Sequence, residues 1–226
     1  MRNFISDFET FRSIKFGLVF RTIERALRLI NAKDKICMIP CGHGWYFHHF
    51  FKKNYKFFAA DINLRLAKIS YQRAAELWTN GYRPPIIECN LKNIPFKDNS
   101  FNCFIAIRTI GHFPEEFRID CLKEMKRVTK RWILVQYASK HTIKYFFRKL
   151  RNSPKLDDKF KERLSTDHSD KPERFYRKFK ARTGLKKMNK KEMYAEAEKA
   201  GLKVKKIFSL LPLFSERWYV LLEKTD

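Results

Sequence analysis

The chain has 226 residues, of which 44% are hydrophobic and 15% aromatic. This length suits one large α/β domain rather than two full domains, and the apolar content excludes a chain that is disordered throughout. Lysine and arginine number 49 against 24 acidic residues, so the formal net charge is +25. Such an excess predicts an anionic partner, and the alternative explanation is a codon bias toward lysine.

The first 30 residues carry charged side chains throughout. They leave no apolar core for a signal peptide and no run of about 20 residues for a membrane span. The five cysteines are odd in number and lie mostly in apolar segments, which is typical of buried thiols in a reducing compartment. We therefore expect a cytoplasmic protein, with a peripheral position at a membrane surface left open.

Residues 1–31 have apolar side chains at spacings of three and four, which predicts two amphipathic helices. Strand and helix character then alternate along the chain. The predicted strands are Lys35–Pro40, Phe57–Asp61, Ile86–Cys89, Phe101–Arg108 and Trp132–Tyr137, and the predicted helices are Asn63–Asn80, which Asn63 could cap, and Pro114–Lys130. This alternation predicts βαβ units and a mainly parallel sheet.

Residues 141–191 hold 18 lysines or arginines against 6 acidic residues and lack strand character. Their interleaved cations and aromatics fit nucleic-acid binding, a membrane interface or a solvated helical cap, and the sequence leaves the three open. A helix is predicted over Lys190–Ala200 with Gly201 as its stop, followed by closing strands at Leu202–Phe208 and Trp218–Glu223.

The segment Ile36–Trp45 indicates a strand that runs into a Cys-Gly-x-Gly turn and a helix. Glycine permits positive φ and lets a ligand approach the backbone, and a helix start favours an anionic group. The next strand ends in Asp61, 19 positions after Gly42. A carboxylate at that place is able to accept hydrogen bonds from both ribose hydroxyls of a bound nucleoside.

Three later runs complete the pattern: Asn90–Asn102, which contains Asn-Ile-Pro-Phe-Lys-Asp-Asn-Ser-Phe-Asn, then Ile105–Phe113 with its histidine, and Leu122–Thr129. Their order resembles the class I S-adenosylmethionine (SAM)-dependent methyltransferases of the type 11 kind, over about residues 33–138. The resemblance implies a Rossmann-like α/β fold: a mainly parallel seven-stranded sheet with an antiparallel C-terminal strand. It also implies SAM as the cofactor and methyl transfer as the activity.

The resemblance also implies roles for residues of the cofactor site. Gly42 and Gly44, with the backbone near Cys41, would hold the amino-acid end of SAM. Asp61 would hold the ribose and Ile62 would flank the adenine.

Residues after the third and fourth strands complete the implied site. Asn90 would lie at the adenine amino group, with Leu91 packed on the ring. Arg108 to His112 would line the place where the methyl group meets its acceptor. His112 is the candidate catalytic base where the acceptor must lose a proton, and its alternative role is packing at the cofactor site.

The chain departs from the family pattern at Met38, where an acid is usual, at Pro40 in place of the first glycine, and at Asn90 and Asn102, where acids are usual. A neutral Asn90 bond is roughly half as strong as a charge-assisted one. We expect no metal, because Cys37 and Cys41 have a spacing that fits zinc pairs poorly and no second cysteine pair follows.

The sequence therefore predicts one methyltransferase-like domain over 1–226, with an N-terminal helical segment (1–31), a SAM-binding core (33–138), a basic helical cap (141–191) and a closing helix and strands (192–226). Its expected function is methyl transfer to an anionic acceptor: a cell-envelope glycolipid or lipid, RNA or a small metabolite. The alternative is a non-catalytic protein of this fold that binds RNA or an anionic membrane through its basic cap.

Overall fold

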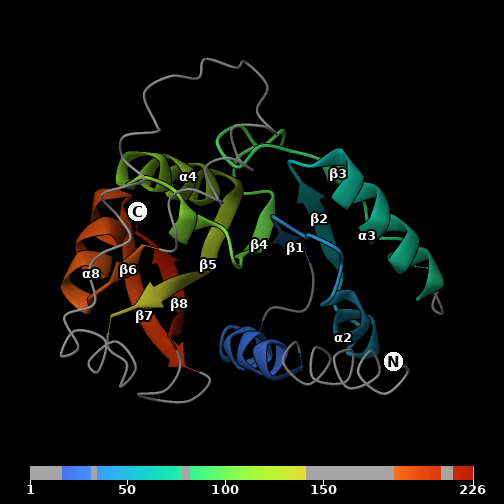
Figure 1. The fold of residues 1–226 in the computed structure, drawn as a ribbon, viewed down its shortest axis with the longest axis horizontal. Coiled ribbons are helices and arrows are strands. Elements are labelled where there is room, and N and C mark those ends of the chain that lie inside the picture. Colours follow the sequence, from blue (N-terminus) through green and yellow to red (C-terminus); the bar gives the residue numbers. More distant parts are fainter. Residues whose placement is uncertain (1–16, 32–34, 78–81, 141–185, 210–215, 226) are drawn as a thin grey trace, which may run out of the picture.

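The computed structural model describes residues 17–31, 35–77, 82–140, 186–209 and 216–225, which form one sheet with helices on both faces (Figure 1). The main path of the sheet has the order β3-β2-β1-β4-β5-β8-β7, and β6 pairs with β5. The strands are β1 (Ile36–Met38), β2 (Phe57–Asp61), β3 (Ile86–Glu88), β4 (Phe101–Ala106), β5 (Thr129–Ser139), β6 (Lys187–Met188), β7 (Leu202–Ser209) and β8 (Arg217–Lys224).

The helices are α2 (Phe47–Lys52), α3 (Leu64–Glu76), α4 (Glu115–Val128) and α8 (Lys190–Lys199), with the 3-10 turn η1 (Ile110–His112). Residues 17–29 form a further helix, here called the N-terminal helix. α3 begins at Asn63, whose side chain accepts a hydrogen bond from Leu66 N, as the sequence predicts. α8 is followed by Gly201 at φ +67°, a conformation that glycine adopts without a Cβ penalty.

Strands β1 to β5 pair with one another in parallel, and β8 runs antiparallel between β5 and β7. The chain passes from β1 outward to β2 and β3, and then returns to β4 on the other side of β1. The carboxyl ends of β1 and β4 are therefore the point where the strand order reverses. In open α/β sheets, ligands bind at this place.

Two apolar cores flank the sheet. α4 and α8 cover one face, where Cys121, Leu122 and Met193 pack against the strands. The N-terminal helix, α2 and Ala74 of α3 cover the other face, which we call the N-helix face. The strands bury side chains on both faces, which explains why β1 and β2 have almost continuous apolar sequences.

The expected fold class is confirmed, with one addition. Residues 187–188 lie in a stretch that the sequence indicates to lack strands, yet they form β6 beside Ala138–Ser139. A two-residue strand has no periodicity that a sequence could show, and its pairing partner defines it. The expected first N-terminal helix and residues 141–185 of the basic cap lie outside the described residues.

A buried ion pair joins the two helices of the opposite face. Arg118 of α4 is fully buried and Glu196 of α8 is 2% exposed. Arg118 Nε donates to Glu196 Oε2 at 2.8 Å, and Nη1 donates to the Phe113 carbonyl oxygen at 2.7 Å. The guanidinium therefore connects α4, α8 and the end of η1. In the part of the chain that the structure describes, no helix has the length and apolar content needed to cross a membrane.

Candidate functional site

The turn after β1 has the open backbone that the sequence predicts. Gly42 has φ +58° and Gly44 has φ +69°, both in the left-handed region that favours glycine. A Cβ atom added to Gly42 would meet no atom within 4 Å, whereas one added to Gly44 would lie 2.9 Å from the Phe47 ring. Gly42 therefore faces open space, while Gly44 allows close packing against α2.

Asp61 connects the end of β2 to this turn. Its Oδ2 accepts a hydrogen bond from Gly42 N at 2.8 Å, and its Oδ1 accepts one from Asn63 N at 3.0 Å. The residue is 3% exposed. The two hydrogen bonds fix the orientation of the carboxylate at the end of β2. The predicted acid and the predicted glycine turn are thus in direct contact.

Side chains of α3 hold the turn from behind. Ser70 Oγ lies 3.2 Å from the sulfur of Cys41, and Arg73 Nη1 donates to the His43 carbonyl oxygen at 3.1 Å. The Arg73 guanidinium also lies 4.0 Å over the Trp45 ring. Burial raises the pKa of the Cys41 thiol to about 12, so this cysteine is protonated at neutral pH.

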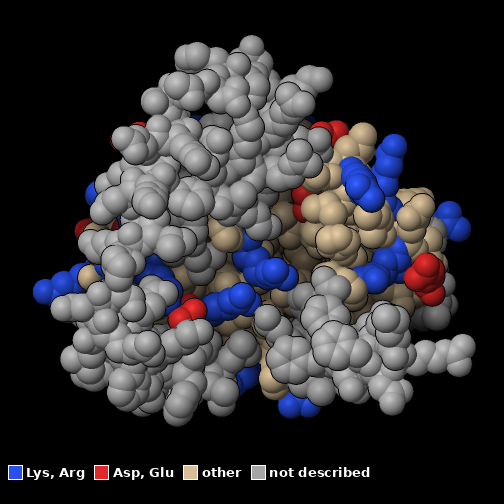
Figure 2. Space-filling model, viewed as in Figure 1, with Lys and Arg blue, Asp and Glu red and all other residues tan. Residues whose placement is uncertain are grey.

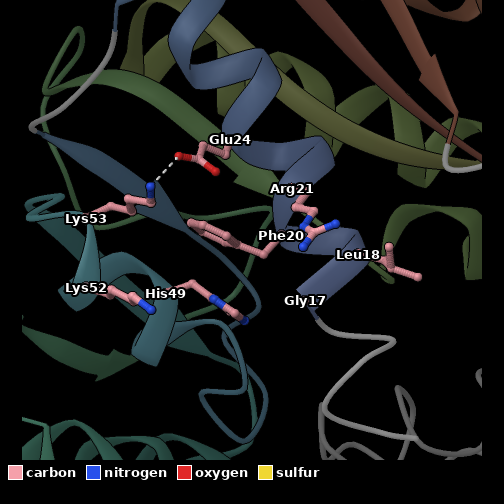
Figure 3. A pocket seen from close by; sticks show the side chains of 8 residues that line it. All are labelled: Gly17, Leu18, Phe20, Arg21, Glu24, His49, Lys52 and Lys53. Atoms are coloured by element: carbon pink, nitrogen blue, oxygen red, sulfur yellow. Dashed lines mark ion pairs between the residues drawn. The ribbon is translucent and has the colours of Figure 1, made fainter.

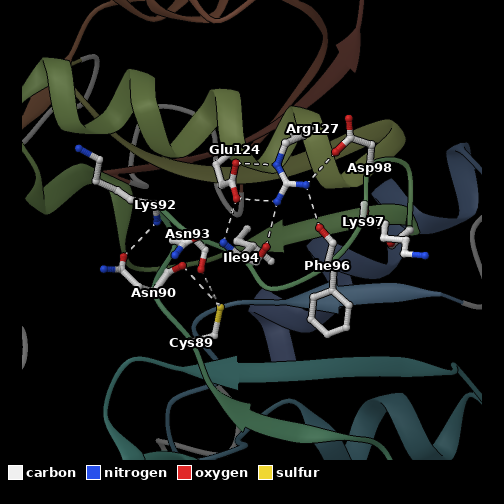
Figure 4. Close-up of polar contacts among 11 residues, drawn as sticks. Cys89, Asn90, Lys92, Asn93, Ile94, Phe96, Lys97, Asp98, Glu124 and Arg127 are labelled. Atoms are coloured by element: carbon white, nitrogen blue, oxygen red, sulfur yellow. Dashed lines mark hydrogen bonds and ion pairs between the residues drawn. The ribbon is translucent and has the colours of Figure 1, made fainter.

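The residues implied for adenine binding follow β2 and β3 at the same edge of the sheet. Ile62 is half-buried and Leu91 is buried. Asn90 is half-buried, and its Oδ1 accepts a hydrogen bond from Lys92 N at 3.0 Å (Figure 4). The side-chain carbonyl of Asn90 therefore shapes the turn after β3 and retains one lone pair for a further donor.

Glu124 and Arg127 of α4 hold the loop after Asn90 (Figure 4). Glu124 Oε1 accepts from Ile94 N at 2.8 Å, and Arg127 Nη2 donates to the Ile94 carbonyl at 2.9 Å. Arg127 Nη1 donates to the Phe96 carbonyl and to Asp98 Oδ1, each at 2.8 Å. The runs Asn90–Asn102 and Leu122–Thr129 of the sequence are therefore joined in one hydrogen-bond network.

Arg108 and His112 lie beyond the end of β4, as the sequence places them. Arg108 is exposed and has φ +64°, and His112 ends η1 and is half-buried. Their assignment to the methyl-acceptor region stays a prediction, as do the roles of Cys41, Gly42, Gly44, Asp61, Ile62, Asn90 and Leu91.

A polar cluster on the N-helix face was not predicted. Gln136 of β5 lies directly opposite Tyr219 of β8, and Ala138 lies opposite Arg217. Side chains two positions apart in a strand share one face of the sheet, so Arg217 lies on the same face as Tyr219. Tyr46, which follows the glycine turn, belongs to the same core as Tyr219.

The buried hydroxyl groups of this cluster lie within the electrostatic influence of two arginines. Burial raises the pKa values of Tyr46 and Tyr219, while the charges of Arg108 and Arg217 act on both phenols in the opposite direction. Both phenols therefore stay neutral at pH 7. Among the described residues, the buried Gln136 Oε1 atom has no hydrogen-bond partner. Lysine and arginine side chains gather in the middle of this view of the molecule, above the N-terminal helix (Figure 2).

The cluster thus combines two buried phenols and a buried amide with the charges of two arginines. The signal in the sequence was Gln136, a polar residue in the apolar run Trp132–Tyr137. Among the described residues, no group of three histidine, cysteine or acidic side chains is arranged to hold a metal ion.

Comparison with known proteins shows which domains this chain is similar to. Residues 36–131 match the family model described as a methyltransferase domain. The magnesium protoporphyrin IX methyltransferase of Synechocystis PCC 6803 with bound S-adenosylhomocysteine (SAH) is similar in structure, with a TM-score of 0.66 and 13% identity over 95% of this chain and 86% of that one. A search of curated proteins gives no match.

Two further solved structures show the same fold. A SAM-dependent methyltransferase of Clostridium acetobutylicum has a TM-score of 0.66 and 10% identity, and covers 93% of this chain and 92% of its own. An O-methyltransferase of neocarzinostatin biosynthesis, crystallised with SAM and a naphthoic acid, has a TM-score of 0.62 and 13% identity over 97% of this chain and 57% of that one.

Residues 36–131 therefore match a methyltransferase domain, and the whole described sheet has the fold of class I methyltransferases. The expected resemblance to SAM-dependent methyltransferases is thereby confirmed, since similar structures were solved with SAM or SAH bound.

Proposed function

We propose that this chain transfers a methyl group from SAM to an anionic acceptor. The observation that carries the proposal is the contact between the glycine turn and the acid of β2. Gly42 leaves open space on the side where a Cβ would be, and the carboxylate of Asp61 is buried directly beside it, where it accepts a hydrogen bond from Gly42 N. An open backbone next to a carboxylate suits a ligand that has both an amino-acid group and a ribose.

SAM supplies an activated methyl group on a sulfonium, so alignment of the two reactants contributes most of the reduction in the barrier. The residues of this chain that would hold the cofactor are Gly42 and Gly44 at the turn, Asp61 at the ribose, and Ile62, Asn90 and Leu91 at the adenine. The Glu124–Arg127 network supports this arrangement, because it fixes the loop that follows Asn90.

The polar cluster on the N-helix face supports an acceptor with a negative group. Arg108 and Arg217 contribute two guanidinium groups that bind carboxylate or phosphate through paired hydrogen bonds. The neutral phenols of Tyr46 and Tyr219 are hydrogen-bond donors, and Gln136 Oε1 is an acceptor. The naphthoic acid bound to the similar O-methyltransferase is a precedent for an acceptor with a carboxyl group on this fold.

His112 would act as the base where the acceptor atom loses a proton during attack. Replacement by Gln should then lower kcat by roughly 10²–10⁴ with little change in SAM affinity. An acceptor that is already deprotonated needs no base, and the same replacement would leave kcat unchanged. The pH profile of kcat separates the two cases.

All five cysteines are free and buried, which supports a cytoplasmic location.

The test of cofactor binding uses two glycines with the same backbone strain. Gly42→Ala and Gly201→Ala each force a Cβ into the left-handed region, at a cost of roughly 1–2 kcal/mol. The Gly42 methyl would enter the open space of the turn, whereas the Gly201 methyl meets the flexible end of Lys126. We expect calorimetric titration with SAM or SAH to show binding by wild type and by Gly201→Ala, and strongly weakened binding by Gly42→Ala.

No heat with either ligand in folded wild-type protein would refute the enzyme and favour the non-catalytic alternative. That alternative predicts salt-sensitive binding of RNA or anionic membranes that is indifferent to SAM. Labelled SAM then allows glycolipid, RNA and small-molecule pools to be screened for the acceptor, with Arg217→Gln as the variant expected to lose it.

A further inference from the structure

A cavity of about 450 Å³ lies between the N-terminal helix and the end of α2 (Figure 3). Its lining residues are Gly17, Leu18, Phe20, Arg21, Glu24, His49, Lys52 and Lys53. None of them belongs to the cofactor site or to the polar cluster described above. The cavity is therefore a second candidate site, independent of methyl transfer.

The walls of this cavity combine cations with apolar surface. Arg21 and Lys52 are exposed, while Phe20 is 3% exposed and its ring stacks on the His49 imidazole at 4.6 Å. The acid at the cavity, Glu24, is paired with Arg28 at 2.8 Å and with Lys53 at 3.4 Å. The charge of Glu24 is thus compensated, and Arg21 and Lys52 leave an excess of positive charge.

The solvent-facing side of the N-terminal helix continues this surface. Two large apolar residues are exposed on it, Leu18 at 46% and Leu29 at 51%. Arg21, Arg25 and Arg28 are exposed between them, at spacings that place all five on one side of a helix. Over residues 17–31 and 47–56 there are six lysines or arginines and a single acidic residue.

We propose that this cavity binds the phosphate of an anionic phospholipid headgroup, with the exposed side of the N-terminal helix lying along the bilayer surface. Arg21 and Lys52 provide the charges that meet the phosphate, and Leu18 and Leu29 provide aliphatic side chains for the acyl boundary. A membrane-surface segment needs cations for the anionic headgroups and apolar side chains for the acyl boundary, and this exposed surface supplies both.

Lipid is favoured over nucleic acid by the kind of apolar group exposed. Single-stranded nucleic acid is bound by aromatic side chains on which bases stack. At this cavity the aromatic ring of Phe20 is buried under His49, and the exposed apolar side chains are leucines. The chemistry at the surface therefore matches a headgroup and acyl boundary better than a base.

The experiment is co-sedimentation of the full chain with vesicles of phosphatidylcholine alone or mixed with phosphatidylglycerol. Wild type should bind the mixed vesicles and not the neutral ones. Each basic residue near an anionic surface contributes about fivefold in affinity. Arg21→Gln with Lys52→Gln should therefore weaken binding by about 25-fold. Both side chains are exposed and leave the Glu24 pairs intact, so the variant should fold.

A matched control has the same net charge. Lys130→Gln with Lys203→Gln removes two exposed lysines at other places and should leave vesicle binding nearly unchanged. Gly17→Leu adds apolar volume at the cavity wall, where a Cβ would lie 4.0 Å from His49 Cε1, and should weaken binding without any change of charge. Both comparisons separate a defined site from general attraction by a cationic protein.

Three results would overturn the proposal. Equal losses in the two double variants would mean that charge alone matters. Equal affinity for soluble glycerol phosphate would mean that the cavity takes a free phosphate and not a lipid. Displacement of the vesicles by a single-stranded RNA, with the same sensitivity to Arg21 and Lys52, would assign the surface to nucleic acid.

Discussion

Replacement of Arg118 by Met should be among the most damaging single changes in this chain. The guanidinium is fully buried, and it donates to Glu196 of α8 and to the carbonyl of Phe113 at the end of η1. Methionine has comparable length and no donors, so Glu196 would remain as a buried carboxylate without its cation. Breaking a buried pair by removing one partner costs about 3–5 kcal/mol.

For a domain of this size each kcal/mol lowers Tm by roughly 2–4 °C, so we expect a loss of about 10 °C. The assay is urea and thermal unfolding followed by circular dichroism. The double variant Arg118→Met with Glu196→Met removes both charges, and it should recover most of the lost stability, because apolar side chains often replace a buried pair without loss. Single variants that each cost less than about 1 kcal/mol, or a double variant as unstable as the sum of the singles, would refute this reasoning.

Three further expectations concern other contacts. Arg127→Gln should reduce SAM affinity, because the loop after Asn90 loses its anchor. The Arg127 hydrogen bond lowers the pKa of Glu124, so its stabilisation is full above the unfolded pKa and is lost as pH falls through the lower folded pKa. The stability difference between wild type and Arg127→Gln, measured by urea unfolding, should therefore shrink as pH is lowered past that value; a difference independent of pH would contradict this. Burial raises the pKa values of the cysteine thiols, so a thiol reagent at pH 8 should modify them slowly in native protein and all five in denaturant; rapid native labelling would contradict the packing. Asn189→Ala should cost about 1 kcal/mol in urea unfolding, since it removes the capping box with Glu192; an unchanged midpoint would show that the cap contributes nothing.

Most of the sheet was predictable because its strands are buried on both faces and separated by helices. The predicted strand Phe57–Asp61 coincides with β2, and the predicted helix Pro114–Lys130 contains α4. β5 extends at both ends beyond the predicted Trp132–Tyr137. Its extra residues are polar apart from Ala138, and they are strand because they pair with β4, β6 and β8, which local sequence does not reveal.

The cofactor half of the site was more predictable than the acceptor half. Gly42 and Asp61 were predicted together because glycine suits an open turn and an acid at the end of the next strand suits a ribose. The structure places the two residues in contact. Tyr219 and Arg217 come from a closing strand whose register with β5 cannot be read from either segment alone. Likewise, Arg118 and Glu196 are 78 positions apart and look like ordinary surface residues of two amphipathic helices.

The placement of β8 between β5 and β7 has a consequence for how the chain acquires its structure. Among the described strands, β7 pairs with β8 alone, and β8 follows it in the sequence. During synthesis β7 therefore leaves the ribosome before any strand exists for it to join. The earlier strands can pair first. We expect β7 and β8 to pair with each other and then to add to the open edge of β5, which brings Arg217 and Tyr219 to their positions.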